Sequence, residues 1–214
     1  IHCLILSILA TVLPMQGANL KPGLVGEYFK GRHSNIPKGA KPFLVRIDKQ
    51  VKFPEVSGDF YGSKLSQNLT VRWTGQLLVE KSGDYKFASA SDDGSRILIN
   101  GKVVVNNWGD HSWTRKEGKT SLTFGTHKIE IQMDQGGGGV GCIAYWTPPG
   151  GKEEPIPTKA LYHKPEQAEI AWDKKGWEKA RAGGSKPAPR RPTAGGGTIP
   201  ENFGNFIGTA VRVG

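Results

Sequence analysis

Two adjacent aspartates, Asp92 and Asp93, are the residues most able to do chemistry, and they lie in the stretch SASDDGSRILINGK. Neighbouring carboxylates repel each other, and aspartate is a poor strand former, although both flanks are typical of β-strands. Taken alone, Asp-Gly favours a turn, so the residues themselves predict a solvated hairpin loop in which Asp92 caps its own backbone. The pair does not predict a glycosidase, because the two carboxyl groups of such enzymes lie about 5 Å or more apart across the scissile bond.

Other catalytic patterns are missing from the sequence. It contains no His-Glu-x-x-His zinc helix, no Cys-x-x-Cys-His haem motif and no Gly-x-Ser-x-Gly elbow. The glycine-rich stretch DQGGGGVG is not followed by Gly-Lys-Ser/Thr, which excludes a phosphate-binding loop. We therefore expect that this chain is not an enzyme.

The composition indicates a globular, loop-rich protein. The 214 residues include 36% hydrophobic residues, 30 glycines and 14 prolines, which is enough for one good domain with additional segments. The net charge of +10 raises the question of an acidic partner such as nucleic acid. The basic residues are scattered, with small clusters at Lys174–Lys175 and Arg190–Arg191, so we interpret them as a solvated surface and a basic tail and expect no nucleic-acid partner.

The first residues, IHCLILSILATVLPMQGA, form an apolar run that ends in small residues. The run is too short to span a bilayer comfortably, and it predicts the apolar part of a secretory signal peptide over residues 1–18, without its usual basic start. A buried strand or helix is the alternative. No other segment is apolar enough to cross a membrane, so we expect a secreted, periplasmic or cell-surface protein. Signal removal would leave Cys142 as a single thiol, which we expect to be a small core residue.

Short strands with frequent turns follow one another from Leu24 to Tyr162. Asn100–Gly101 lies between two β-branched runs and predicts a tight hairpin, and Gly125–Thr126 predicts another. In HKIEIQM, apolar and polar residues alternate, which is typical of a strand with one buried face. Trp73 and Trp146 lie within strand patterns and are expected in the core. The pattern indicates an all-β sandwich or barrel, and the Pro/Gly-rich residues 164–214 indicate a largely irregular linker and tail.

Several motifs in this region resemble one family, the protective-antigen-type (PA-fourteen) domain of bacterial toxins, yeast flocculins, adhesins and some β-glucosidases. They occur in the order GLVGEYF, WTG, SGDYKF, SDDGSRILINGK, NNWG and DQGGGGVGCIAYW, and the match covers residues 24–163. The resemblance implies an antiparallel, lectin-like β-sandwich, in agreement with the strand pattern.

The resemblance also implies a role for the two aspartates. In glycan-binding members, two consecutive aspartates joined by a cis peptide bind calcium, and the calcium binds sugar hydroxyls; Asp92 and Asp93 match that pair. Calcium takes six to eight oxygen ligands, often carboxylates. In the family a second loop completes the shell, which here corresponds to MDQGGGGVG. Asp134 or Gln135 and carbonyls among Gly136–Gly139 are the candidate ligands, although the loop lacks the family's Asn-x-Asp and would equally suit a flexible hairpin.

Residues that could contact a sugar lie in these loops and in NNWGDHSW. The candidates are Trp108, Asn107, Gly136, Gly137 and Gly138. An aromatic face suits the apolar side of a pyranose, but for Trp108 we favour a packing role. Asn106, Asn107, Asp110 and His111 are candidates only for the rim.

We therefore expect a secreted, calcium-dependent carbohydrate-binding module with calcium as its cofactor. Its partners would be a glycan or polysaccharide and neighbouring domains of a longer cell-surface or envelope protein, in keeping with a role in adhesion. The alternative is a non-catalytic structural or assembly β-sandwich that binds no glycan.

Overall fold

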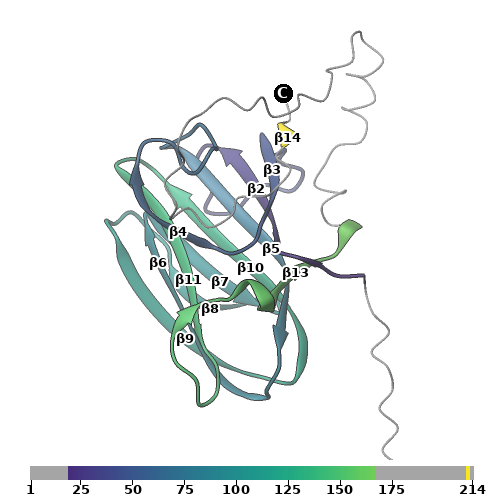
Figure 1. Cartoon of the computed structure of the whole chain (residues 1–214). Coiled ribbons are helices and arrows are strands. Elements are labelled where there is room, and N and C mark those ends of the chain that lie inside the picture. Colours follow the sequence, from purple (N-terminus) through teal and green to yellow (C-terminus); the bar gives the residue numbers. More distant parts are fainter. Residues whose placement is uncertain (1–18, 167–210, 213–214) are drawn as a thin grey trace, which may run out of the picture.

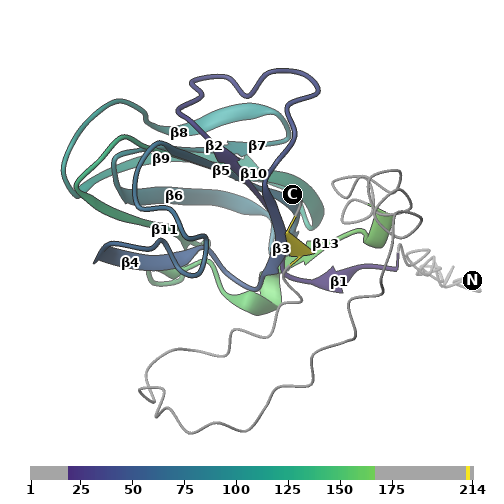
Figure 2. The ribbon, with the colours of Figure 1, turned by 90° about the horizontal axis from the view of Figure 1, so that it is seen from above.

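In a computed structural model, which describes residues 19–166 and 211–212, two antiparallel sheets pack face to face (Figures 1 and 2). This confirms the predicted antiparallel β-sandwich. The larger sheet has the strand order β14 (Val211–Arg212), β3 (Leu44–Asp48), β2 (Leu24–Lys30), β5 (Leu69–Val79), β10 (Gly125–Gln135), β7 (Gly94–Ile99) and β8 (Lys102–Asn107). The smaller sheet has the order β12 (Glu154–Pro155), β11 (Gly139–Thr147), β6 (Gly83–Asp92) and β9 (Thr114–Leu122), with β4 (Lys52–Ser57) also paired to β11.

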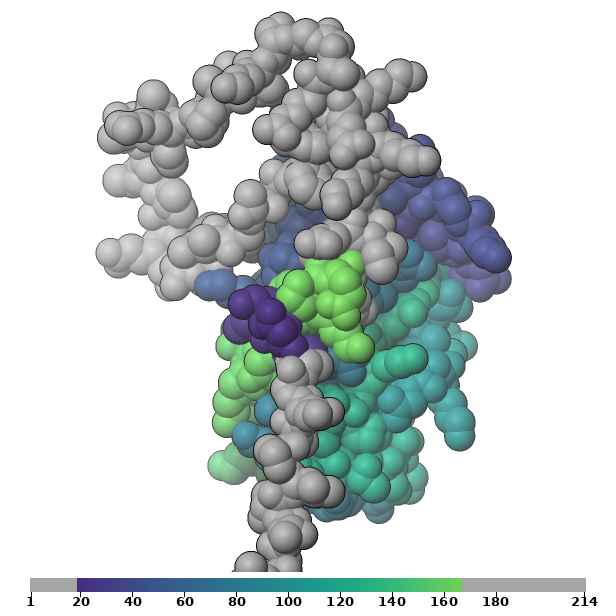
Figure 3. All heavy atoms as spheres, turned by 90° about the vertical axis from the view of Figure 1, so that its right-hand side faces the viewer, coloured from purple at the N-terminus to yellow at the C-terminus, as the bar shows by residue number. Residues whose placement is uncertain are grey.

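The two ends of the sandwich domain lie together on one face. The short strand β1 (Lys21–Pro22) pairs with β13 (Leu161–His163), which pairs in turn with β5 and follows the 3₁₀ turn η1 (Thr158–Ala160). Figure 3 shows these segments side by side, in purple and bright green. The predicted signal peptide (1–18) and most of the predicted tail (164–214) lie outside the described residues. Adjacent ends are the arrangement that allows a domain to be inserted into a longer chain.

Alternation along the strands builds the core between the sheets. In β10, Ile129, Ile131 and Met133 are at most 2% exposed. Trp73 of β5, which pairs with Ile131, is fully buried. Trp146 is also buried, and so is Cys142, whose thiol pKa burial raises to about 12. The predictions that the two tryptophans and the cysteine belong to the core are confirmed.

The turn predictions have mixed outcomes. Asn100 and Gly101 join β7 to β8 with φ values of 51° and 79°, which confirms the tight hairpin. The hairpin predicted at Gly125–Thr126 is wrong, because β9 pairs with β6 in the smaller sheet, whereas β10 pairs with β5 and β7 in the larger one. A turn signal marks where the chain reverses, but the long-range pairing of β10 along the whole of β5 decides where the next strand lies.

A buried carboxylate, Asp48, organises the polar part of the core. Its Oδ2 accepts hydrogen bonds from the Tyr28 hydroxyl (2.7 Å) and Trp73 Nε1 (2.8 Å), and its Oδ1 accepts one from Arg46 Nε (2.7 Å). Burial raises the pKa of Asp48, while Arg46 acts in the opposite direction. Arg46 also donates to the carbonyl of Tyr61 (2.5 Å), so the cluster ties the loop that follows β4 to the larger sheet.

We expect Asp48→Ala to lower the free energy of unfolding by about 3–5 kcal/mol, because it leaves the buried Arg46 without its counter-ion. Urea denaturation of the whole chain measures this. Asp84→Ala is the matched control, since Asp84 is exposed and accepts a hydrogen bond from Ser121, an exposed residue, rather than from a buried one. A loss at Asp48 as small as at Asp84 would contradict the structural role of the cluster.

Candidate functional site

Asp92 and Asp93 lie where the chain passes from one sheet to the other. Asp92 is the last residue of β6 in the smaller sheet, and Gly94 is the first residue of β7 in the larger sheet. The hairpin loop that the residues alone predicted is therefore wrong. The peptide bond between the two aspartates is cis, as the resemblance implied. Their side chains are only 6% and 8% exposed, so two like charges are buried side by side.

Gly94 allows the loop after β8 to approach this crossing. A Cβ atom on Gly94 would lie 2.9 Å from the backbone nitrogen and 3.1 Å from the carbonyl oxygen of Gly109. Any larger residue would push that loop away, so the glycine of the Asp-Asp-Gly motif positions the 107–113 segment against the aspartates.

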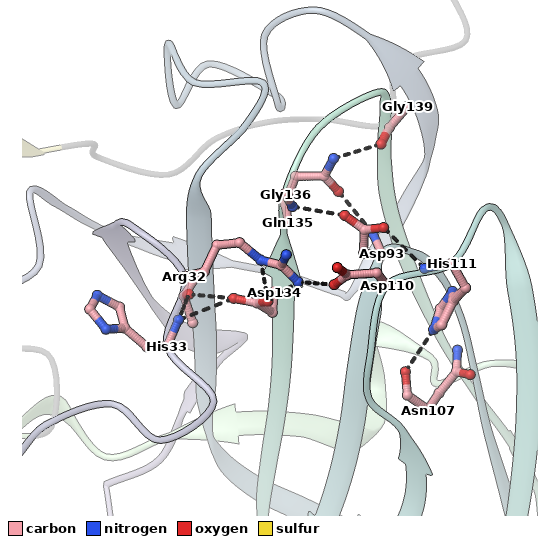
Figure 4. A network of polar contacts seen from close by, with 11 residues as sticks. Arg32, His33, Asp93, Asn107, Asp110, His111, Asp134, Gln135, Gly136 and Gly139 are labelled. Atoms are coloured by element: carbon pink, nitrogen blue, oxygen red, sulfur yellow. Dashed lines mark hydrogen bonds and ion pairs between the residues drawn. The ribbon is translucent and has the colours of Figure 1, made fainter.

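Asp93 connects three segments of the chain (Figure 4). Its Oδ1 accepts a hydrogen bond from the backbone nitrogen of His111 (3.2 Å), and its Oδ2 accepts one from the backbone nitrogen of Gly136 (2.7 Å). Its own backbone nitrogen donates to Gln135 Oε1 (2.8 Å), and Gln135 Nε2 donates to the carbonyl of Gly139 (2.8 Å). The glycine-rich loop is therefore next to the aspartate pair, as the resemblance implied.

Asp92 is in a different situation. The hydrogen-bonding neighbour of its carboxyl group within the described chain is another carboxyl group, that of Glu55. Burial, then the nearby charges of Asp93 and Glu55, raise the pKa of Asp92 to about 6, while His111 acts in the opposite direction. Ionising a carboxyl group in such an environment lowers the stability of the folded protein unless a cation neutralises the charge.

Sequence reasoning missed Glu55. It lies on β4, on the opposite side of β11 from Asp92 of β6. Gly141 of β11 pairs with Asp92, and a Cβ on Gly141 would lie 2.7 Å from Glu55 Cα. No local signal marks it, because β4 and β6 are far apart in the sequence.

Asp134 is held by donors from another loop. Its Oδ2 accepts from Arg32 Nε (2.8 Å), and its Oδ1 accepts from Thr70 Oγ1 (3.0 Å) and the backbone nitrogen of His33 (3.1 Å). Arg32 also pairs with the exposed Asp110, and this contact lowers the pKa of Asp110. In this arrangement Asp134 fixes the Arg32 loop beside the site (Figure 4), and a direct contact of Asp134 or Gln135 with a cation stays a prediction.

The aromatic residues of the 107–113 segment differ in their exposure. Trp108 is half-buried, and the guanidinium of Arg96 lies 4.5 Å from the centre of its ring, in keeping with the packing role that we favoured. Trp113, which sequence reasoning did not single out, is 36% exposed, and a Cβ on Gly141 would lie 2.8 Å from its Cζ3. Trp113 is thus the open aromatic ring beside Asp92. A second tryptophan in NNWGDHSW was the only available signal.

Asn107 lies in the interior rather than at the rim. Its side chain is fully buried and donates to Ser91 Oγ (3.2 Å) and the carbonyl of Thr114 (2.9 Å). Its own carbonyl accepts from His111 Nε2 (2.9 Å), so Asn107 positions the loop that contacts Asp93. Gly136, Gly137 and Gly138 are in the glycine-rich loop, where a Cβ on Gly136 would lie 3.3 Å from Asp93 Oδ2.

The oxygen chemistry of the site suits a hard divalent cation. Asp92, Asp93 and Glu55 supply carboxylate oxygens, and the glycine-rich loop contacts Asp93 through the backbone nitrogen of Gly136. In the part of the chain that the structure describes, no group of three or more His, Cys, Asp or Glu side chains is already arranged to hold a metal ion. The residues fit calcium by type and by burial, because carboxylate oxygens are its usual ligands and none of the ion pairs within residues 19–166 involves Asp92 or Asp93.

Comparison with known proteins identifies the class of β-sandwich domain to which this chain belongs. The family model described as "PA14 domain" matches residues 20–160, and the chain belongs to this family. Anti-sigma-I factor RsgI3 of Acetivibrio thermocellus is 30% identical over 142 residues, which are 65% of this chain and 21% of that protein. The chain thus spans about a fifth of the length of this curated relative.

Solved structures share the fold. An "anti-sigma factor domain-containing protein" superposes with a TM-score of 0.60 at 25% identity, over 68% of this chain and 49% of that chain. A structure titled "PA14 sugar-binding domain from RTX adhesin" superposes with a TM-score of 0.57 at 24% identity, over 66% of this chain and 98% of that chain. Among the described residues, none form a helix of the length and apolarity that a membrane span requires.

In the presence of a chelator, we expect Asp92→Asn to stabilise the protein at pH 7.5. The folded-state pKa of Asp92 is raised to about 6, above its ordinary value, so ionising Asp92 costs stability as the pH rises from about 4 to about 6, and the full cost remains above that range. Removing the charge should raise Tm by roughly 2–4 °C at pH 7.5 and leave it nearly unchanged at pH 4. Thermal melts in EDTA at both pH values measure this, and a lower Tm for the variant at pH 7.5 would contradict it.

Proposed function

We propose that this chain is a calcium-assisted carbohydrate-binding module. One observation carries the proposal: Asp92 and Asp93 are buried together, and a third acid, Glu55, is the hydrogen-bonding neighbour of Asp92. A divalent cation at this position would neutralise the pair. Similarity to a sugar-binding domain of an adhesin supports the choice of ligand.

The ion would supply coordination positions that neighbouring sugar hydroxyls can fill as neutral oxygen ligands. Asp92 and Asp93 would hold it, together with carbonyls of residues 136–139. Gln135 keeps this loop on Asp93, and Asp134 keeps the Arg32 loop beside it. A sugar bound there would lie near the exposed ring of Trp113, whose face suits the apolar side of a pyranose.

The same geometry favours binding over catalysis. Asp92 and Asp93 are consecutive residues, and they cannot flank a glycosidic bond in the way that a general acid and its partner do. We infer a binding role in a secreted or cell-surface protein. The adjacent ends of the sandwich and the share of the relative that it covers fit a module within a longer chain.

The alternative is an assembly domain that binds no sugar. It is favoured by the same adjacent ends, which would let the sandwich act as a spacer or platform between neighbouring domains. The two functions differ in their need for an ion, because a spacer does not need a cation at Asp92.

The cation is tested by calorimetric titration of the whole chain with calcium, followed by a glycan array with calcium or with EDTA. We expect calcium binding and calcium-dependent glycan binding, and we expect the double variant Asp92→Asn/Asp93→Asn to lose both. Asp84→Asn, at an exposed carboxylate on the same sheet, should retain both. Wild-type protein that binds no calcium would reject the proposal. Calcium binding without any glycan ligand would favour the assembly domain.

Trp113→Ala tests the aromatic contact. We expect the glycan affinity to fall by roughly tenfold through loss of stacking, while the calcium affinity stays within about twofold of the wild type, because the ring supplies no oxygen ligand. Phe124→Ala, which removes an exposed aromatic ring elsewhere, is the control and should leave both affinities unchanged. Titrations of each variant with calcium and with a glycan identified on the array measure the two effects. Equal glycan affinity of wild type and Trp113→Ala would exclude the contact.

A further inference from the structure

We propose that Glu55 of β4 is a third carboxylate ligand of the cation site. We also propose that Gly139 of β11 is a glycine because the Glu55 side chain lies over it, and that Gly141 is a glycine because the Glu55 backbone approaches it. This inference rests on the proposed cation at Asp92 and Asp93, and it assigns that site an additional residue from a distant strand.

The strand register brings Glu55 to the pair. β4 pairs with β11 in a register that shifts between Val140 and Cys142, and Glu55 faces this irregular point. On the other side of β11, Gly141 pairs directly with Asp92. A Cβ on Gly141 would lie 2.7 Å from Glu55 Cα and 2.8 Å from its nitrogen. Only a residue without a side chain thus separates Glu55 from Asp92.

The side chain of Glu55 runs across a second glycine. A Cβ on Gly139 would overlap Glu55 Oε1 and would lie 2.9 Å from its Cδ and 3.1 Å from its Cγ. The carbonyl of Gly139 accepts the hydrogen bond of Gln135, which holds the backbone of Asp93. The glutamate carboxyl group is therefore against the same loop that contacts Asp93, and it reaches the carboxyl group of Asp92.

Charge balance supports a ligand at this point. Asp92 is more than nine-tenths buried, and its carboxyl group has the acid Glu55 as its hydrogen-bonding neighbour. Among the ion pairs of residues 19–166, none involves Asp92, Asp93 or Glu55. The nearby guanidinium of Arg32 is engaged by Asp134 and Asp110. Three carboxyl groups gathered at one point supply the oxygen ligands that a hard divalent cation prefers.

The side chain of Glu55 is open to solvent on one side and therefore accessible to an ion. Its side chain is exposed, whereas Asp92 and Asp93 are fixed by burial and by the hydrogen bonds of their segment. Its strand is anchored from behind, since the Tyr61 hydroxyl donates to the carbonyl of Pro54 (2.9 Å). An exposed carboxylate on an anchored strand can turn toward a cation, and each added carboxylate raises the affinity of an oxygen site for calcium.

The test compares calcium affinities of whole-chain variants at pH 7.5 by calorimetry. We expect Glu55→Ala to weaken calcium binding by roughly tenfold. Glu55→Gln should also weaken it, because it removes the charge but can still hydrogen-bond Asp92. Glu117→Ala, at an exposed glutamate on β9 of the same sheet, should match the wild type.

Gly139→Ala tests the position of the Glu55 side chain independently. The added methyl group displaces the Glu55 carboxyl group, so we expect calcium to bind about as weakly as in Glu55→Ala. Because both changes remove one interaction, the double variant should be no weaker than Glu55→Ala alone. Melting temperatures in EDTA, and their rise on adding calcium, check folding and binding without any glycan.

The outcomes separate this inference from the proposed function. If wild type binds no calcium, both fail. If Asp92→Asn/Asp93→Asn abolishes calcium binding while Glu55→Ala and Glu55→Gln stay within about twofold of wild type, only this inference fails. Loss in Glu55→Ala but not in Glu55→Gln would mean that the residue serves only as a hydrogen-bonding neighbour of Asp92, which also overturns it. Additive losses in Glu55→Ala and Gly139→Ala would reject the role of the glycine.

Discussion

Repulsion between carboxylates buried at the crossing from β6 to β7 is the constraint on which the site depends. The backbone N–H groups of His111 and Gly136 stabilise the negative charge of Asp93 by hydrogen bonds, and these contacts bring two distant loops to the crossing. The charge of Asp92 is less well stabilised, because its hydrogen-bonding neighbour is the acid Glu55. The loops are therefore assembled around a buried carboxyl group that has no ion pair within residues 19–166. This is the physical reason for expecting a ligand at this position.

The core shows how the same chain treats an aspartate that has only a structural role. Asp48 is also buried, but the Tyr28 hydroxyl, the Trp73 indole and the Arg46 guanidinium satisfy its two oxygens. Burial raises the pKa of both Asp48 and Asp92. The donors distinguish them: a buried acid with a complete set of donors stabilises the fold, whereas a buried acid without them is available for binding.

The sandwich separates these two roles in space. Packing between the sheets and the Asp48 cluster fixes β4 and the loop that follows it, while the segments that meet at Asp92 and Asp93 lie at the crossing between the sheets. A rigid two-sheet scaffold can therefore carry different loops without losing its core. Membership of the PA14 family and the position of both domain ends on one face agree with a module that is used within longer proteins.

The sequence by itself determined the strands, their buried faces and the pair of aspartates. Alternation in β10, Asn-Gly at the β7–β8 turn and the ordered motifs are local features, and local features are what periodicity and turn chemistry report. Only the tertiary structure decided which strands are neighbours. It put β9 and β10 in different sheets, brought Glu55 across β11 to Asp92, and left Trp113 exposed. The physical reason is that a period of two residues fixes the face of a side chain but not the partner of a strand, and cross-strand partners define both the site and its charge.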